Sequence, residues 1–500
     1  MGNHHPHGQK SGRSTPSSTS SQNGSKKTIS RTTSGNDIKE QQATALLPLE
    51  KLAKILTDRS MKDEGINGIS FHVFHRSLFP RYQIFADRLY NYLLKSSKAK
   101  TTYLGTTAFK QQCEKYLAIL DDDLVRETLV KMFSDDDDNI PIESFRTLLM
   151  CSYHISMDHY SEGPQMCFSI NKMLTSVVES CYHGKKTLSG KYVSTWIGLN
   201  IPRLLFPLHR YAVHSLATSW RNLEQEEPTL AAEEHGGDVV INPGLELATP
   251  VLEQPPPFGQ GKPPHPHLLT MSLSWLLAGA LSPIYSRPQK AHSPHNSGVG
   301  LASVNFLAKL LCSVPSHWTL LYDSDDNGLG TNRFLHHVLS YKGPTLCLIK
   351  ADNGSLFCVA SPCEWKESHL YWGGEEAAVL QLMPKFAVLE RGSKMLYLNT
   401  TVRGYPHGLR AGKDPRAPII SIDAGFEKVE YQKIPYHLET VEVWGCGDQV
   451  MRERQLEVKK WEVKEAERQR NVKMSAADWL DHPDRYLLEL AGRPQYHDSQ

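Results

Sequence analysis

The chain has 500 residues, of which 40% are hydrophobic and 22% charged, as is typical of a soluble protein with about two to four domains. Its 55 basic and 54 acidic residues leave a net charge of +1, so no global basic field draws the chain onto a nucleic acid. Nine cysteines without a C-x-x-C pair, and no apolar run of the roughly 20 residues that a spanning helix needs, exclude a disulfide-stapled scaffold and a membrane-spanning protein.

Residues 1–45 are rich in Ser, Thr, Gly, Asn and His and nearly free of apolar side chains, which predicts a disordered tail. The tail has a basic excess that suits contact with anionic lipid headgroups, carried by Lys10, Arg13, Lys26, Lys27, Arg31 and Lys39. The chain opens Met-Gly-Asn, as N-myristoylation signals do, although Pro6 stands where those signals carry Ser or Thr. Gly2 is therefore a candidate lipidation site, and an ordinary unmodified tail is the alternative.

Residues 46–221 carry apolar side chains at helical spacing, which predicts an all-α domain. Four consecutive acids, Asp135–Asp138, stand between two of these helical segments and resemble a calcium loop. Counted from Asp135, position six is Ile140 instead of Gly and position twelve is Arg146 instead of Glu. The pattern favours a degenerate EF-hand-like unit kept for packing, with weak calcium binding as the alternative. Two further segments, 68–74 and 105–109, look like similarly degenerate hands.

Residues 222–267 are rich in Pro, Gly and Glu without apolar periodicity, and we expect an extended linker there. A second domain is predicted over 268–447 and opens with two apolar helices, Leu268–Leu281 and Gly298–Ser313. The first of these is too short to cross a bilayer and should be buried.

Closely spaced strand patterns follow, which indicates antiparallel pairing. They cover Trp318–Tyr322, Thr345–Ala351, Ser355–Ala360, Ala378–Leu382, Phe386–Leu389, Met395–Asn399, Ile419–Ile422 and Leu438–Trp444. A helix is predicted over Asn332–Tyr341, and Asn353-Gly354 favours a hairpin with a two-residue type I′ turn. The fold class expected is α+β, with helices packed on an antiparallel β-sandwich.

Residues 448–500 begin with a densely charged run, Arg452–Arg470, that predicts a long exposed helix. A capping pattern at Ser475–Asp478 then predicts a second, short helix ending near Gly492. Large apolar side chains in this region suit a partner's groove, and packing back onto the sandwich is the alternative. The candidate partner-binding residues are Trp461, Trp479, Tyr486, Leu487 and Leu490.

Candidate chemistry is sparse. No nucleophile elbow, Walker loop or dinucleotide fingerprint is present, so we expect no catalytic residue and no cofactor. Asp323–Gly328 fits only the first half of a calcium loop and is expected to form a turn and helix cap. The tail histidines His4, His5 and His7 lack neighbours that would fix them, so no metal site is expected.

Four segments in the second half of the chain follow a known order. They are a Trp-x-Leu-x-Tyr strand, a Gly-Pro-x-Leu hairpin, a Gly-Glu turn and a closing Glu-Val-Trp strand, found here at 318–322, 343–346, 374–375 and 442–444. This order resembles that of the TLDc domain, which oxidation-resistance proteins share with regulators of the vacuolar proton pump. The Met-Gly-Asn start, the degenerate hands and the helical tail make the chain similar to the MTOR-associated, lysosomal branch of that family.

The resemblance implies a non-enzymatic adaptor that is cytoplasmic and peripheral on the lysosomal membrane. Its expected partners are proteins, namely the V-ATPase and mTOR-linked signalling components, with no nucleic acid. One alternative is an oxidation-resistance protein acting through a cysteine. Another is a calcium-responsive interaction module that uses Asp135–Asp138.

Overall fold

In the computed structural model, the structure describes residues 35–157, 170–225, 267–286 and 317–470, together with residues 487, 490 and 491. The chain divides into two units, Met1–Leu47 and Pro48–Gln500. Helix α1 (Gly35–Glu64) begins within the predicted tail 1–45 and crosses from the first unit into the second. The predicted helix Gly298–Ser313 lies outside the described residues.

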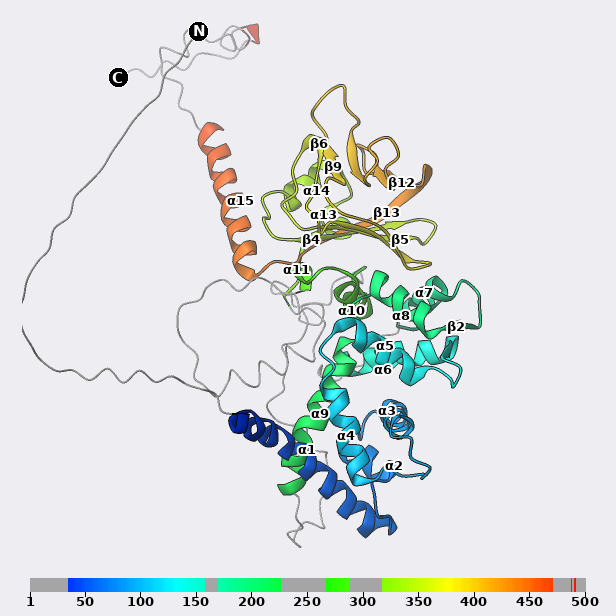
Figure 1. Cartoon of the computed structure of the whole chain (residues 1–500). Helices are drawn as coiled ribbons and strands as arrows, with labels where there is room; N and C mark the ends of the chain where they lie inside the picture. The colour runs from blue at the N-terminus through cyan, green and yellow to red at the C-terminus, as the bar shows by residue number, and fades with distance from the viewer. Residues whose placement is uncertain are drawn as a thin grey trace, which may run out of the picture. The chain divides into compact units, whose positions relative to one another are not determined.

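The first half of the second unit is helical, as the sequence predicts (Figure 1). Its further helices are α2 (Phe71–Leu78), α3 (Gln83–Ser96), α4 (Thr106–Leu117), α5 (Asp122–Phe133), α6 (Ile142–Met157), α7 (Ile170–Tyr182), α8 (Gly190–Asn200) and α9 (Phe206–Gln225). Two short strands, β1 (Asn139–Pro141) and β2 (Thr187–Ser189), pair with each other between these helices.

The helices α1–α4 and α5–α8 form helix–loop–helix units that are joined in pairs by short antiparallel bridges. In the first pair, Ile69 N donates to Leu104 O at 2.7 Å and Leu104 N donates to Ile69 O at 3.1 Å. In the second pair, Ile140 lies opposite Leu188 in the β1–β2 ladder. These bridges explain why isolated apolar residues occur in otherwise polar loops: each holds two loops together.

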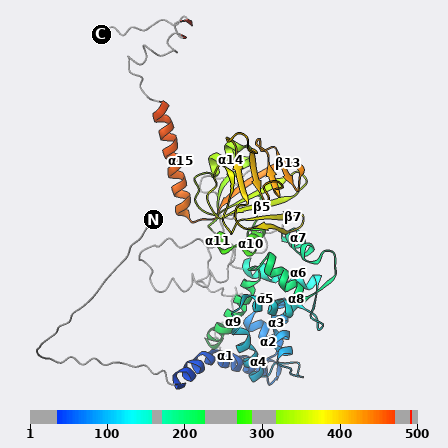
Figure 2. The ribbon, with the colours of Figure 1, turned by 45° about the horizontal axis from the view of Figure 1, so that its top comes forward.

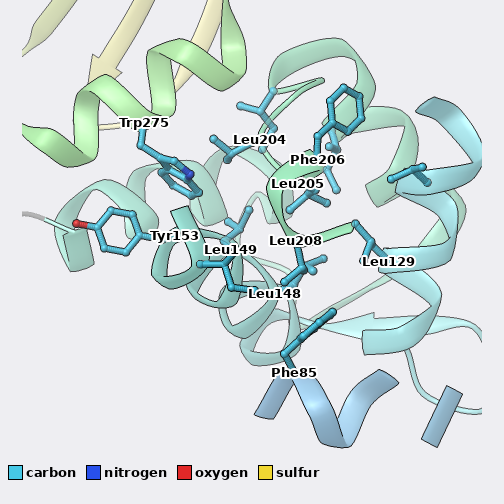
Figure 3. Packing of buried hydrophobic residues seen from close by; sticks show 14 of the residues in the cluster. Phe85, Leu129, Leu148, Leu149, Tyr153, Leu204, Leu205, Phe206, Leu208 and Trp275 are labelled. Atoms are coloured by element: carbon cyan, nitrogen blue, oxygen red, sulfur yellow. The ribbon is translucent and has the colours of Figure 1, made fainter. Parts of the chain in front are cut away.

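Leucines of α6 and of the segment that leads into α9 lie at the centre of the view of the helical core in Figure 3. Trp275 is fully buried in the same core, and its ring meets Tyr153 edge-on with 5.3 Å between ring centroids. Trp275 belongs to α10 (Met271–Ala280), in which every residue is buried. The prediction of a buried apolar helix at this position is confirmed. A short helix, α11 (Pro283–Ser286), follows it.

The second half is an antiparallel sheet of eleven strands (Figure 2). They are β3 (Thr319–Asp323), β4 (Thr345–Ala351), β5 (Leu356–Ser361), β6 (Ser368–Trp372), β7 (Ala378–Met383), β8 (Ala387–Arg391), β9 (Leu396–Asn399), β10 (Gly408–Ala411), β11 (Ile420–Ile422), β12 (Lys428–Tyr431) and β13 (Ile434–Gly445). Helices α13 (Ser324–Asn327) and α14 (Thr331–Val338) follow β3, and α15 (Gln449–Arg470) follows β13. The α+β class and the antiparallel pairing are confirmed.

Strand β13 carries the chain from one layer of the sheet to the other. Its first residues pair with β12, and its last residues pair with β3 and β4 after a register shift between Leu438 and Thr440. The two layers share one core, in which Phe357 of β5 meets Tyr431 of β12 with 4.8 Å between ring centroids. A single long strand therefore closes the sandwich.

Strands β4 and β5 are buried on both faces, which accounts for their unbroken apolar sequences. Cys347 and Ile349 point into the core between the two layers, whereas Leu346 and Leu348 belong to the same buried cluster as α10 and the helical core. The sheet is thus covered on its second face by helices from the first half of the chain.

The hairpin between β4 and β5 forms as predicted, but its turn differs. Gly354 has a φ of +79°, whereas Asn353 is not left-handed, so the turn is not type I′. Gly354 N donates to Ala351 O at 3.0 Å, and the connection is a three-residue loop that ends in a left-handed glycine. The additional residue lets Ala351 N pair with Ser355 O at 3.0 Å and preserves the ladder.

Candidate functional site

Helix α15 is anchored to the sandwich by its first two turns. Gln455 is 1% exposed, and its side-chain amide donates to the backbone oxygens of His337 at 2.9 Å and Leu339 at 3.0 Å. These oxygens lie at the end of α14, where helical carbonyls lack partners of their own. Gly447 N donates to the Tyr341 hydroxyl at 2.8 Å just before the helix begins. One buried glutamine therefore caps one helix while it holds another in place.

Beyond Gln455, no residue of the described part of α15 is fully buried. Trp461 is 64% exposed and Val463 is 54% exposed. Val458 is three residues from Trp461, so the two share a helix face. An exposed tryptophan on a helix fixed at one end is a suitable anchor for a protein partner.

Of the predicted partner-binding residues, Trp461, Leu487 and Leu490 are described. Leu487 and Leu490 are 64% and 84% exposed, and Ala491 N donates to Leu487 O at 3.0 Å in a helical turn. The side chains of all three residues are exposed. Gly2, Trp479 and Tyr486 lie outside the described residues.

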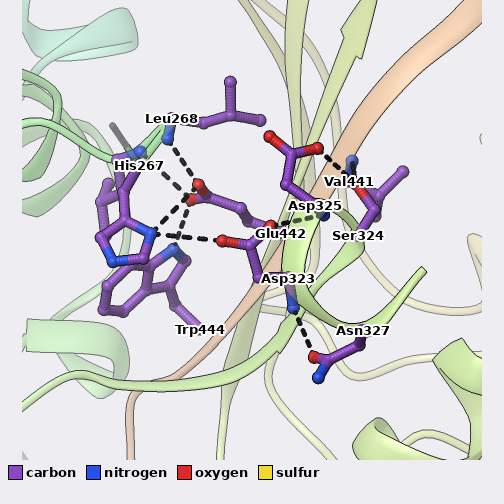
Figure 4. A network of polar contacts seen from close by, with 10 residues as sticks. His267, Leu268, Asp323, Ser324, Asp325, Asn327, Val441, Glu442 and Trp444 are labelled. Carbon is purple, nitrogen blue, oxygen red and sulfur yellow. Dashed lines mark hydrogen bonds and ion pairs between the residues drawn. The ribbon is translucent and has the colours of Figure 1, made fainter. Parts of the chain in front are cut away.

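A second polar site lies where the linker rejoins the fold (Figure 4). His267 points between two acids, with Nδ1 at 3.3 Å from Asp323 Oδ2 and 3.5 Å from Glu442 Oε1. Asp323 is 6% exposed and Glu442 is 1% exposed. The carboxylate of Asp323, and then that of Glu442, raises the pKa of His267 to about 10, against the opposing effect of burial.

The two acids of this site are held by hydrogen bonds from several directions. Glu442 accepts from Leu268 N at 2.5 Å, from Leu269 N at 3.2 Å and from Trp444 Nε1 at 2.9 Å. Asp323 accepts from Asp325 N at 2.9 Å and caps α13. The expectation of turn and helix-cap chemistry at Asp323 is thus confirmed, but this residue also faces His267, which its local sequence did not indicate.

The acidic loop Asp135–Asp138 uses its carboxylates within the fold. Asp135 Oδ1 accepts from Asn139 N at 2.8 Å and from Asp137 N at 3.2 Å. Asp136 pairs with Lys95 at 2.6 Å, and this lysine lowers the pKa of Asp136. These contacts stabilise the conformation of the loop.

The described cysteines are shielded from solution to different degrees. Cys113, Cys181, Cys347, Cys358 and Cys446 are buried, whereas Cys151 and Cys363 are partly exposed. Burial raises the pKa of Cys151 and of Cys181 to about 12, and it raises the pKa of Cys347 further. Because the thiolate is the reactive form, these environments oppose peroxide chemistry.

Residues 301–463 match the TLDc domain family. This part of the chain is a TLDc domain. The match ends within α15, so the TLDc region includes Gln455 and Trp461. The resemblance inferred from the order of strand motifs is confirmed.

Three curated proteins are similar in sequence to parts of this chain, at low identity. The MTOR-associated protein MEAK7 of Xenopus laevis is 25% identical over 153 residues, 27% of this chain and 33% of the relative. MEAK7 of Mus musculus is 24% identical over 167 residues, 29% and 36% of the two chains. The protein named Restriction of telomere capping protein 5, from Neurospora crassa, is 24% identical over 248 residues, which are 35% of this chain and 41% of the relative. The matches thus span about a third to two fifths of the relatives' lengths.

Proposed function

We propose that this TLDc protein is a non-enzymatic adaptor at the lysosomal membrane that binds the V-ATPase, mTOR-linked signalling components or both. The observation that carries the proposal is Trp461, exposed on a helix that a buried Gln455 fixes to the TLDc sandwich. Two relatives described as MTOR-associated support the link to mTOR signalling.

The partner-binding surface would be the outer face of α15 around Trp461. Aromatic side chains dominate the binding energy of protein interfaces, and a helix of this length suits a groove on a partner. Because α15 is already helical and anchored, binding would not require the cost of ordering it. The predicted residues Trp479, Tyr486, Leu487 and Leu490 would extend this surface.

Membrane contact would be peripheral and would depend on Gly2 and the basic tail. In the described part of the chain, no helix is long and apolar enough to cross a bilayer. A single acyl chain gives only marginal membrane binding, so the basic residues of the tail would supply the second attraction.

Proximity labelling in cells tests the partner assignment. The full chain should label V-ATPase or mTOR-linked proteins, and a truncation before Asp448 should not. Since the truncation also removes Gln455, Trp461→Ala in the full chain separates binding from folding. Labelling that is unchanged by both alterations would contradict the assignment of α15.

Membrane fractionation tests the lipid anchor separately. Gly2→Ala should move the protein from the lysosomal membrane fraction to the soluble fraction, because it removes the only residue at which N-myristate can attach. A Gly8→Ala variant, altered in the same tail, should stay with membranes. Equal membrane association of the wild type and Gly2→Ala would contradict a myristoyl anchor.

A further inference from the structure

Three metal-ligating side chains meet at the site of Figure 4, although they are far apart in the sequence. His267 precedes α10, Asp323 ends β3 and Glu442 lies in β13. One donor atom from each lies within 4.8 Å of the others. The folding of three separate segments is therefore needed to assemble this group.

The register of the sheet sets two carboxylates against each other. Glu442 and Asp323 are directly paired across the β13–β3 ladder, and like charges at such positions repel. Both side chains are buried, so water screens this repulsion poorly. A protonated His267 supplies one positive charge against two negative ones. A divalent cation bound to neutral imidazole would balance both carboxylates.

The two distances from His267 Nδ1 to the carboxylate oxygens are also compatible with ligands of one cation. Separations of 3.3 and 3.5 Å from His267 Nδ1 exceed the usual range of N–H···O bonds. In a tetrahedral zinc site with bonds of about 2.0–2.1 Å, two ligand atoms are about 3.3 Å apart. Nδ1 itself is buried, with no partner at hydrogen-bond geometry among the described residues.

The surroundings hold the two acids as metal ligands are usually held. Trp444 Nε1 and two backbone N–H groups orient Glu442, and Asp325 N orients Asp323. Hydrogen bonds of this kind fix the direction of ligating carboxylates. The His267 side chain is 24% exposed, which leaves a path for an ion and a water molecule from solution.

We propose that His267 Nδ1, Asp323 and Glu442 bind one zinc-class divalent cation, with water in the fourth position. The ion joins the end of the linker to β3 and β13, so its role is structural. This site is independent of the partner-binding surface on α15.

Calorimetry with zinc chloride on the full chain tests the site. His4, His5 and His7 are first replaced by Ala, because tail histidines bind zinc by themselves. We expect one zinc per chain. Cobalt should give the visible absorption of a four-coordinate ion. Magnesium and calcium should bind far more weakly, because imidazole suits them poorly.

Variants separate a metal site from a simple ion pair. His267→Lys keeps a positive charge against the two acids but removes the ligand, so it should lose zinc binding at least about tenfold while remaining folded. Asp323→Asn should also lose zinc, and it retains an oxygen for capping α13. Asp326→Asn, which removes an exposed charge from the same turn, should bind zinc as the background protein does.

Thermal unfolding provides a second readout for the same variants. Zinc should raise the melting temperature of the background protein and of Asp326→Asn, but not that of His267→Lys. Zinc binding that survives His267→Lys, or its absence from the background protein at micromolar zinc, would overturn the proposal. If His267→Lys does not fold, zinc binding and the zinc-induced rise in melting temperature are compared between Asp323→Asn and the background protein instead.

Discussion

At the scale of single residues, the surroundings of two histidines shift their pKa values in opposite directions. Two carboxylates raise the pKa of His267 to about 10, whereas burial, with a smaller effect of the neighbouring Arg210, lowers the pKa of His209 to about 4. His209 lines a pocket of about 440 Å³ between the α4–α5 connection and α9, and its ring lies 5.0 Å from that of Tyr116. Asp122, Arg210 and His214 are the other titratable groups of this pocket.

The lowered pKa of His209 makes stability depend on pH. Between pH 6.5 and pH 4, His209 binds a proton in the unfolded chain but not in the folded chain. The free energy of unfolding therefore falls as the pH drops from about 6.5 to about 4. The expected loss from pH 7 to pH 5 is about 2 kcal/mol in the free energy of unfolding. Denaturant unfolding should show this loss reduced in His209→Gln but not in His437→Gln, which alters an exposed histidine of β13. An equal pH dependence in all three proteins would contradict the assignment.

The sequence predicted the role of a single residue only where neighbouring residues in the sequence determine that role. Asp323 was identifiable as a cap because its turn follows it directly, and β4 was identifiable from its apolar run. His267 and Glu442 are 175 positions apart in the sequence, and no local pattern predicts that they are in contact. A charged residue inside an otherwise apolar strand was the one available signal.

At the scale of elements, two contacts join helices to their neighbours. Gln455 connects α15 to the end of α14. Gly279 lets α10 approach the segment before α9, where Arg203 N donates to Gly279 O at 3.1 Å. The sequence analysis missed strands β6, β10 and β12, because strands of four or five residues are too short to show a sustained alternation.

Gln455→Ala should loosen α15. It leaves two carbonyls of the α14 terminus without a partner in a buried place, at a cost of about 1–3 kcal/mol. Hydrogen exchange should become faster over the first turns of α15, and the free energy of unfolding should fall. Gln469→Ala, at an exposed position of the same helix, should change neither by more than about 0.5 kcal/mol. Unchanged exchange in Gln455→Ala would show that other contacts hold the helix.

Gly279→Ala should destabilise the packing of α10. An added methyl group would lie 2.4 Å from Leu204 Cδ1 and 3.0 Å from Leu204 Cα, so the backbones must separate. The expected cost is about 1–3 kcal/mol by thermal or denaturant unfolding. Gly198→Ala is the control, because its methyl group meets only the movable end of Arg126. A Gly279→Ala protein as stable as the wild type would contradict close packing here.

At the scale of the whole molecule, the two halves of the chain have different architectures. Helix–loop–helix pairs build the first half, and a TLDc sandwich closed by β13 builds the second. The sequence predicted both classes, since apolar periodicity changes from helical to alternating along the chain. The sequence could not predict that α10 would lie in the core under the sheet. A helix that is apolar on all sides is buried, but its sequence does not indicate which element covers it.

The role of α15 as a protein-binding element rests on Trp461. The affinity of the purified full chain for purified V-ATPase tests it most directly, by interferometry on the immobilised complex. We predict binding that Trp461→Ala weakens about 30-fold, as expected for an interface residue worth about 2 kcal/mol. Val463→Ala, an exposed apolar residue two positions away on another face, should stay within about twofold. Equal affinity of Trp461→Ala and wild type would contradict this role, and no binding by the wild type at micromolar concentration would contradict the V-ATPase as the partner.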